Sequence, residues 1–451
     1  MIYKFCGEII KTIHCTATHS ITIRKHLTHN IMKILRYLLL AFTAMACSLG
    51  ASAQANTTSP YSMFGYGILN DYATSSQRAM GGVGYAMNGG RQINVMNPAS
   101  YAAIDSLTFL WDIGVDVSFL NSKEGNLKAN SIGGGLDYIT MQFPITKKIG
   151  ASIGLLPYSS VGYEFGGKIL EDSDVLGSES RNGSGGLNLL YAGAAITPVK
   201  GLSVGFNVGY LFGTNIYDAY VYSTSTSLYE RVIKVHSWDL KIGALYTYNL
   251  DKKNKVSVGV TFSPKKSLQG NTWGAYYDIT NDTRQDTIGY TSLNGNNYTP
   301  MSFGGGISYE YDKRIFVEAD FTYQNWKDAK FTSVEGFDNN VNSLTFDNRW
   351  KAALGVQYTP QLRGGYMRRV NYRLGAYCTH DYVTVRGNNV REYGVTCGLG
   401  LPAPGSKTVI NIGFEYKHRA TAPVNYISEN YFNVTVGVNF NQMWFWKNKI
   451  E

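Results

Sequence analysis

Hydrophobic and polar residues alternate strictly along several long stretches of the chain. In residues 202–213, Leu, Val, Phe and Tyr fill one set of alternate positions, and mainly Ser, Gly and Asn fill the other. Residues 107–119, 256–263 and 432–440 repeat this pattern. A period of two residues predicts a β-strand with one apolar and one polar face. The pattern therefore predicts an all-β fold.

Two features of these stretches distinguish a membrane barrel from a soluble sandwich or barrel. The runs are about 10–14 residues long, whereas strands of soluble proteins average about 5–6 residues and a membrane-spanning strand needs about 9–11. Their polar face also carries many glycines and few Lys or Glu, unlike a face that meets water. Apolar-out and polar-in alternation is typical of outer-membrane barrels. We therefore expect the apolar positions to face lipid.

Fourteen such strands can be counted, and bacterial single-chain barrels have an even number. Short connections alternate with longer ones, so we expect the short turns in the periplasm and the longer loops outside. The sequence predicts an all-β, 14-stranded antiparallel transmembrane β-barrel over residues 106–446, followed by a periplasmic tail at 447–451. The strands are centred near Ile113, Tyr138, Ile153, Ala192, Val208, Ile242, Val260, Ile307, Phe321, Leu354, Ala376, Gly398, Ile412 and Val436.

The chain begins with a targeting segment. Residues 32–53 have a basic start, an apolar centre and the small-residue end Ala51-Ser52-Ala53, which is typical of a secretory signal peptide. Residues 1–31 are interpreted as an upstream extension, so the true start is Met1 or Met32. We assign residues 1–53 to the extension plus signal peptide. We expect cleavage near Ala53 and export to the outer membrane of a Gram-negative cell.

The composition of the chain argues against some classes of binding partner and cofactor. Removal of residues 1–53 takes six Lys or Arg and one Glu from the chain, so the formal net charge falls from +9 to +4. So mild a balance argues against nucleic acid as a partner. The three remaining His show no metal-ligand spacing, and no metal or other cofactor is expected. A hairpin centred between Gly387 and Asn388 would set Cys378 opposite Cys397, so they are either a disulfide or two small apolar fillers.

Residues 54–105 do not alternate and are rich in glycine. The segment is too polar to span lipid, and a periplasmic start leaves the barrel lumen as its place. We expect an N-terminal hatch there, with Arg78 and Arg91 pairing with acidic residues of the barrel wall, and inward glycines making room. The alternative is a flexible periplasmic tail. The wall charges expected to face the lumen are Asp112, Asp116, Glu318, Asp320, Asp347, Arg349 and Lys351.

The stretch Ala79 to Ala86, with hatch glycines Gly81, Gly82 and Gly84, precedes a hatch motif of Asn97, Pro98 and Ala99. With a signal peptide before them and fourteen strands after them, these motifs make the chain resemble the FadL/TodX family of outer-membrane transporters. The resemblance covers essentially the whole mature chain. It implies a barrel closed by an N-terminal hatch and the uptake of hydrophobic molecules such as long-chain fatty acids or aromatic hydrocarbons.

In that family, ligands leave sideways through a gap at a kinked third strand. Here the third strand contains Pro157, which cannot donate to a strand ladder, followed by Gly162 and Gly166. The resemblance therefore implies a lateral-gate strand at these residues. Loop aromatics are candidates for a surface capture site for ligand, with packing among themselves as the alternative. They are Trp273, Tyr276, Tyr277, Trp326 and Phe331.

Three functions are compatible with this sequence. The first is a passive channel for hydrophobic small molecules, a monomer surrounded by lipid and lipopolysaccharide. The second is a binding or shuttle component of a protein secretion apparatus built on the same barrel. The third, a lipid-modifying enzyme using His380, lacks a readable set of nucleophile, base and orienting residue. We therefore expect no enzyme activity.

Overall fold

The computed structural model describes residues 57–171, 174–224, 226–278, 283–293, 297–329 and 346–443. The expected signal peptide, Phe331 and the tail at 447–451 lie outside these residues. No helix among the described residues has the length and apolar character needed to cross a bilayer.

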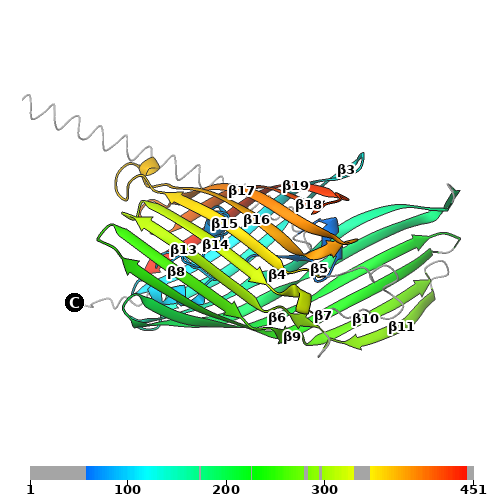
Figure 1. The fold of residues 1–451 in the computed structure, drawn as a ribbon, viewed down its shortest axis with the longest axis horizontal. Coiled ribbons are helices and arrows are strands. Elements are labelled where there is room, and N and C mark those ends of the chain that lie inside the picture. Colours follow the sequence, from blue (N-terminus) through cyan, green and yellow to red (C-terminus); the bar gives the residue numbers. More distant parts are fainter. Residues whose placement is uncertain are drawn as a thin grey trace, which may run out of the picture. The chain divides into compact units, whose positions relative to one another are not determined.

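Within the described part of the chain, fourteen antiparallel strands close into a barrel (Figure 1). Each barrel strand pairs with the next one along the chain, except that β8 pairs with β13 because β9 to β12 lie outside the ring. Strand β19 pairs with β2 and completes the ring. The predicted 14-stranded antiparallel barrel is confirmed, and each predicted strand centre lies within one of these strands. The barrel strands are β2 (Thr108–Glu124), β3 (Leu127–Pro144), β4 (Ile149–Glu171), β5 (Asp174–Val199), β6 (Leu202–Tyr222), β7 (Thr226–Asn249), β8 (Asn254–Ser263), β13 (Ser302–Tyr311), β14 (Ile315–Gln324), β15 (Arg349–Tyr358), β16 (Asn371–Val385), β17 (Asn388–Pro402), β18 (Val409–Ala422) and β19 (Ser428–Met443).

Short elements complete the described fold. A hairpin of β10 and β11 pairs with the half of β7 that β8 leaves free, and β9 pairs with β12. Strands β4 to β7 have 23, 26, 21 and 24 residues, about twice what a bilayer requires. At β4 to β7 the sheet therefore continues beyond the membrane, at the end of the barrel where the hairpin of β10 and β11 lies. The remaining elements are η1 (Pro60–Met63), β1 (Ile68–Leu69), α2 (Ser75–Arg78), η2 (Pro98–Ala103), β9 (Lys266–Ser267), β10 (Gly270–Asp278), β11 (Thr283–Ser292), β12 (Tyr298–Thr299), η3 (Trp326–Asp328) and η4 (Tyr366–Arg368).

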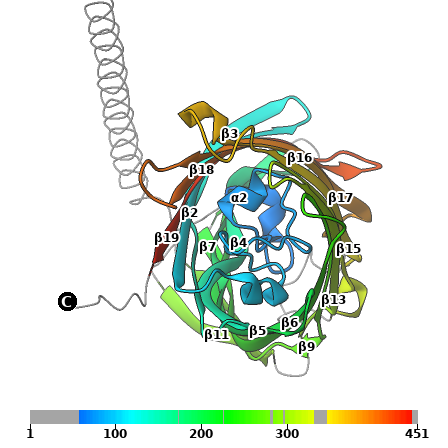
Figure 2. The same ribbon diagram turned by 90° about the vertical axis from the view of Figure 1, so that its left-hand side faces the viewer.

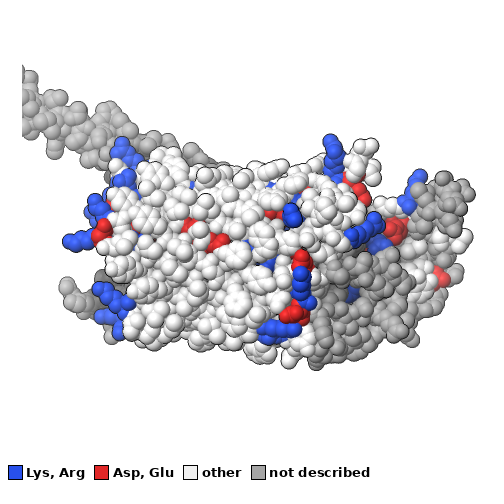
Figure 3. Space-filling model, viewed as in Figure 1, with Lys and Arg blue, Asp and Glu red and all other residues white. Residues whose placement is uncertain are grey.

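The outer face of the barrel is apolar. Phe206 and Val208 are 48% and 41% exposed, whereas Asn207 between them is 5% exposed. On the face drawn in Figure 3, charged residues gather at the left end and again from about the middle of the view rightwards, and the band between these two groups is mostly uncharged. The apolar side of each strand thus faces outwards, as predicted for a transmembrane barrel.

Residues 57–107, here called the N-terminal segment, lie inside the ring of strands (Figure 2). Their backbone passes so close to the wall that only glycine fits at some inward positions. A Cβ at Gly375 would lie 2.2 Å from the amide nitrogen of Gly81, and one at Gly259 would lie 1.8 Å from the carbonyl oxygen of Tyr85. The expectation that these inward glycines make room for the segment is confirmed.

The two cysteines do not face each other. Cys378 lies opposite Tyr393, and Cys397 lies opposite Leu374. Both thiols are free, so the predicted opposition and the disulfide it allowed are wrong. The hairpin turns at Arg386 and Gly387, and an irregularity between His380 and Thr384 shifts the register further.

Candidate functional site

The wall of the barrel is interrupted between β3 and β4. These strands pair only from Ile139 opposite Leu155 to Pro144 opposite Gly150. The structure describes the backbone of both strands throughout, and it records no pairing of residues 127–138 with β4. Because β4 starts at Ile149 and a spanning strand needs about 9–11 residues, the ladder stops before β4 has crossed the bilayer. The interruption therefore lies at membrane depth.

Part of the N-terminal segment occupies the edge that this interruption leaves open on β4. Strand β1 pairs with β4 at Ser159 and Ser160, and the amide of Asn70 donates to the carbonyl of Tyr158 at 2.9 Å. The Ser62 hydroxyl donates to the carbonyl oxygen of Gly162 and accepts from its amide, at 3.1 and 3.0 Å. These hydrogen bonds give backbone groups of β4 the partners that β3 does not provide.

The segment also reaches the opposite edge. The Ser131 hydroxyl of β3 donates to the Thr58 hydroxyl at 2.8 Å. Glycines at positive φ give the intervening chain its turns, with φ of 61° at Gly65 and 87° at Gly67. A Cβ at Gly67 would lie 2.5 Å from the carbonyl oxygen of Ser160. Residues 58–70 thus lie between the two edges of the interruption.

An ion-pair cluster holds the segment just after β1. The Asp71 carboxylate lies 2.5 Å from the Lys351 ammonium and 3.2 Å from the Arg349 guanidinium. Both cationic side chains are 8% exposed. Burial raises the pKa of the Asp71 carboxyl, but the charges of Lys351 and Arg349 outweigh it and hold that pKa well below its usual range. Asp71 therefore remains ionised at physiological pH.

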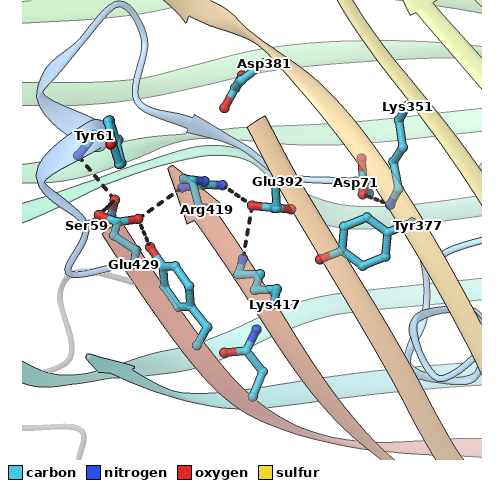
Figure 4. Close-up of polar contacts among 12 residues, drawn as sticks. Ser59, Tyr61, Asp71, Lys351, Tyr377, Asp381, Glu392, Lys417, Arg419 and Glu429 are labelled. Atoms are coloured by element: carbon cyan, nitrogen blue, oxygen red, sulfur yellow. Dashed lines mark hydrogen bonds and ion pairs between the residues drawn. The ribbon is translucent and has the colours of Figure 1, made fainter. Parts of the chain in front are cut away.

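A second cluster holds the segment before β1 (Figure 4). The Ser59 hydroxyl donates to Glu429 of β19 at 2.6 Å, and the Tyr431 hydroxyl donates to the same carboxylate at 2.8 Å. The Arg419 guanidinium lies 3.9 Å from Glu429 and 2.6 Å from Glu392. The stretch that covers the interruption is thus anchored to the wall at both of its ends.

Apolar and aromatic side chains pack behind this stretch. The Trp326 ring is fully buried, with its centroid 4.3 Å from that of Tyr382 and 6.2 Å from that of Tyr66. The Tyr382 hydroxyl donates to the carbonyl of Gly67 at 2.6 Å, and the amide of Tyr66 donates to that hydroxyl at 3.1 Å. The interior beside the interruption therefore combines an apolar cluster with a hydroxyl that holds the two residues just before β1.

Two small cavities lie in the described lumen. One, of about 120 Å³, lies beside Asp71 and is lined by charged residues of both signs, among them Arg349, Glu392 and Arg419. A second, of about 90 Å³, lies beside Tyr72, Tyr158 and Lys241. Drug-sized ligands occupy pockets of about 300–1,000 Å³ with mainly apolar walls. Among the described residues, no group of three His, Cys, Asp or Glu could hold a metal ion.

The motif predicted at Asn97, Pro98 and Ala99 lies at the start of η2. The Asn97 side chain accepts from the amide of Ala99 at 3.1 Å and donates to the carbonyl of Tyr85 at 2.7 Å, so it caps η2 and ties it to the preceding turn. A Cβ at Gly243 of the wall would lie 2.1 Å from the Asn97 side-chain oxygen. All three motif residues are buried. They act here as structural contacts between the N-terminal segment and the wall.

The glycines predicted in the segment also contact the wall. The amide of Gly81 donates to the Thr396 hydroxyl at 2.8 Å, and the amide of Gly84 donates to Asp320 at 2.6 Å. Gly81 and Gly82 have φ of 74° and 79°, which explains the residue type there.

Of the two arginines expected to pair with acids of the wall, Arg78 does so, although with an acid that was not named, and Arg91 does not. Arg78 pairs with Asp137 of β3 at 2.6 Å, and Arg91 lies 3.8 Å from Asp105 within the N-terminal segment itself. Asp112 instead accepts from the Tyr138 hydroxyl. Regular alternation did not indicate Asp137, because the β2–β3 register shifts between Gly114 and Val115.

The predicted gate residues all lie on β4. Pro157 sits at a register irregularity with β5, two residues after the β3–β4 ladder ends. Gly162 bonds to Ser62, and Gly166 lies further along the free edge. Their role in a gate remains a prediction.

The predicted capture residues do not form one surface. Trp326 is fully buried, so it is not part of an exposed site. Trp273, Tyr276 and Tyr277 lie on β10, and the Tyr276 ring contacts Tyr229 at a centroid distance of 5.0 Å. Sequence reasoning missed Asp71 and Ser59, because neither stands in a motif.

The fold defines a class of membrane barrel that solved structures share. Similar structures are the toluene transporter TodX of P. putida (TM-score 0.59, 14% identity, 84% of this chain and 100% of that chain), a FadL homologue of Pseudomonas aeruginosa (0.58, 10%, 83% and 99%) and the toluene transporter TbuX of Ralstonia pickettii (0.54, 12%, 82% and 98%). The chain thus has the fold of FadL-type barrels. The sequence model of the family described as BamG matches residues 33–451, and the chain belongs to this family. No curated protein matches the sequence.

Proposed function

We propose that the protein is an outer-membrane barrel that takes up hydrophobic small molecules and releases them sideways through the interruption between β3 and β4. The N-terminal segment serves as the hatch, and residues 58–70 are its gate. The single observation that carries this proposal is the β3–β4 ladder that ends at Ile139 and Leu155, at membrane depth. An apolar ligand gains about 0.8 kcal/mol for each CH₂ group buried, so an exit into lipid is favoured over an exit into water.

The solved structures with the same fold support the ligand class. Two of them are toluene transporters. The apolar cluster around Tyr66, Trp326 and Tyr382 lies directly behind the gate and could be contacted by such a ligand once residues 58–70 move. Lateral release therefore requires this stretch to leave the β4 edge.

A second function is favoured by a different observation. The recorded lumen cavities of about 120 and 90 Å³ are smaller than a long-chain fatty acid requires and are lined partly by charges. A lumen filled in this way suits a barrel that binds other proteins, such as a component of a protein secretion apparatus. That role would need no passage through the barrel.

A disulfide cross-link between the gate and β4 tests lateral release. Ile68 lies opposite Ser160, so I68C/S160C in a C378S/C397S background would join β1 to β4 by a disulfide. We expect the oxidised variant to lose most uptake of radiolabelled oleate and toluene into cells, and to regain it after reduction. The matched control is L374C, which would pair with the native Cys397 opposite it on the lipid-facing side and leave the gate free.

Unchanged uptake in the oxidised gate variant, together with uptake that depends on the gene, would contradict lateral release but retain transport. Uptake that is the same with and without the gene would contradict transport altogether. In that case stable co-purification of periplasmic or surface proteins with the barrel would support the second function.

A further inference from the structure

The end of the barrel that carries the short turns is strongly basic. Six connections join strands there: β3–β4, β5–β6, β7–β8, β13–β14, β15–β16 and β17–β18. Together their residues include eleven Lys or Arg and two Asp, an excess of nine positive charges. We call these eleven cations the basic ring. Its members are Lys147, Lys148, Lys200, Lys252, Lys253, Lys313, Arg314, Arg363, Arg368, Arg369 and Lys407.

The charges of the ring are available to a partner. Within the described part of the chain, none of the eleven side chains forms an ion pair. Most of them, including Lys148, Lys252 and Lys407, are exposed. An excess of this size on one rim repels itself unless anions approach it.

Large apolar side chains stand beside the cations, in the same turns or, for Val199, at the adjoining strand end. Ile145, Val199 and Leu250 are 58%, 59% and 59% exposed, and Leu362 and Met367 are 54% and 65% exposed. Each lies within two residues of a ring cation. An aliphatic side chain next to a flexible cation suits the bilayer interface, where the first enters the acyl region and the second meets phosphate.

We propose that the basic ring binds the headgroup phosphates of anionic phospholipids in the leaflet that surrounds the turn end of the barrel. The distribution of the charges favours lipid over an acidic protein. Every one of the six turns contributes at least one cation, so the charge follows the whole circumference. A leaflet contacts a barrel all the way round, whereas a protein partner would need charge on one side only. This inference does not depend on what passes through the lumen.

Nanodiscs of phosphatidylcholine with one tenth phosphatidylglycerol provide the test. Purified full-length barrel is reconstituted, the discs are isolated, and their phosphatidylglycerol fraction is compared with that of empty discs. A cation at an anionic surface is worth about 1 kcal/mol, or about fivefold in local binding. We therefore expect the wild-type discs to be enriched severalfold in phosphatidylglycerol, and 0.5 M NaCl to reduce this enrichment.

The variant K148Q/K252Q/K407Q removes one cation from each of three turns and lowers the excess of the ring from nine to six positive charges, so its enrichment should fall measurably below that of the wild type. Its matched control, K123Q/K128Q/K168Q, removes three exposed cations from the opposite ends of the strands and should keep it. Heat-modifiable migration in gels would verify that both variants retain the folded barrel. Equal enrichment in the two variants would overturn the proposal. Binding of poly-glutamate without any phosphatidylglycerol enrichment would also overturn it, in favour of an acidic protein partner.

Discussion

The ion pairs of Asp71 should control how often residues 58–70, the proposed gate, leave the β4 edge. The substitution Asp71→Asn keeps the size of the side chain but removes its charge. It leaves Lys351 and Arg349, each with a side chain 8% exposed, without their nearest carboxylate. Removal of one partner of a buried ion pair destabilises by about 3–5 kcal/mol, because the other charge stays desolvated.

Two features of the site reduce this magnitude. The Asp71 side chain is 34% exposed to the neighbouring cavity, so solvent screens part of its interaction. The Lys351 ammonium also keeps its contact with the Tyr377 ring, whose centroid lies 4.3 Å away. We therefore expect a loss of about 2–3 kcal/mol, which corresponds to a roughly 30- to 150-fold increase in the population with the gate detached.

Hydrogen exchange can measure this population, because local opening limits the exchange of bonded amides. In Asp71→Asn, peptides covering residues 66–71 should exchange about 30- to 150-fold faster, whereas peptides from the β19–β2 ladder should not change. Asp105→Asn is the matched control within the N-terminal segment, since its pair with Arg91 spans 3.8 Å between side chains that are 52% and 75% exposed. Such surface pairs contribute about 0–1 kcal/mol.

The reasoning would be refuted by exchange in residues 66–71 that stays within threefold of the wild type. A second variant separates lost attraction from the presence of an unpaired charge. In D71N/K351M, one of the two cations that have lost the Asp71 carboxylate is replaced by an apolar side chain of similar length. Its exchange should therefore be slower than that of Asp71→Asn alone.

Further substitutions test the contacts between the segment and the wall. In Gly375→Val, a Cβ 2.2 Å from the Gly81 nitrogen should expel the segment and make it sensitive to protease, whereas Gly413→Ala, whose nearest neighbour would be 3.5 Å away, should not. Trp326→Ala should destabilise the protein by about 3–5 kcal/mol in thermal unfolding, whereas Trp238→Ala, at an outward position 62% exposed, leaves no interior cavity and should destabilise it less. Because the pKa of Asp71 is lowered in the folded state, its pairs stabilise above its ordinary value of 3.8 and weaken as pH falls through the folded value. The exchange difference between wild type and Asp71→Asn should thus be constant from about pH 5 to 9 and shrink only below about pH 4.

Alternation along the strands sufficed to predict the barrel because a barrel wall is a regular object. Each strand has lipid on one side and the lumen on the other, so the residues at 204, 206 and 208 must differ in kind from those at 205 and 207. The same regularity explains why the strand count could be read from the sequence. Where the ladder is irregular, the prediction failed: the shift between His380 and Thr384 moved Cys378 away from Cys397.

The contacts of the N-terminal segment could not be predicted in the same way. Its path is fixed by isolated bonds, such as that of the Asn97 side chain to Tyr85 and that of Asp71 to Lys351, and not by a period in the sequence. The wall charges Arg349 and Lys351 were expected to face the lumen, and they do, but their acid was not identified. The position of a charged residue in the alternation of a strand shows which face it is on. Its partner on an irregular chain depends on tertiary structure alone.

The interruption in the wall makes the barrel and its N-terminal segment dependent on each other. An unpaired strand edge at membrane depth is unfavourable, because lipid offers no partner for backbone amides and carbonyls. On β4 these groups are satisfied between Tyr158 and Gly162 by residues of the segment. The segment in turn is held by wall residues on either side of that stretch, through Ser59 and Asp71. Detachment of residues 58–70 would therefore expose both the β4 edge and the apolar cluster behind it, so under the proposed function a hydrophobic ligand bound there would stabilise the detached state that the protein alone disfavours.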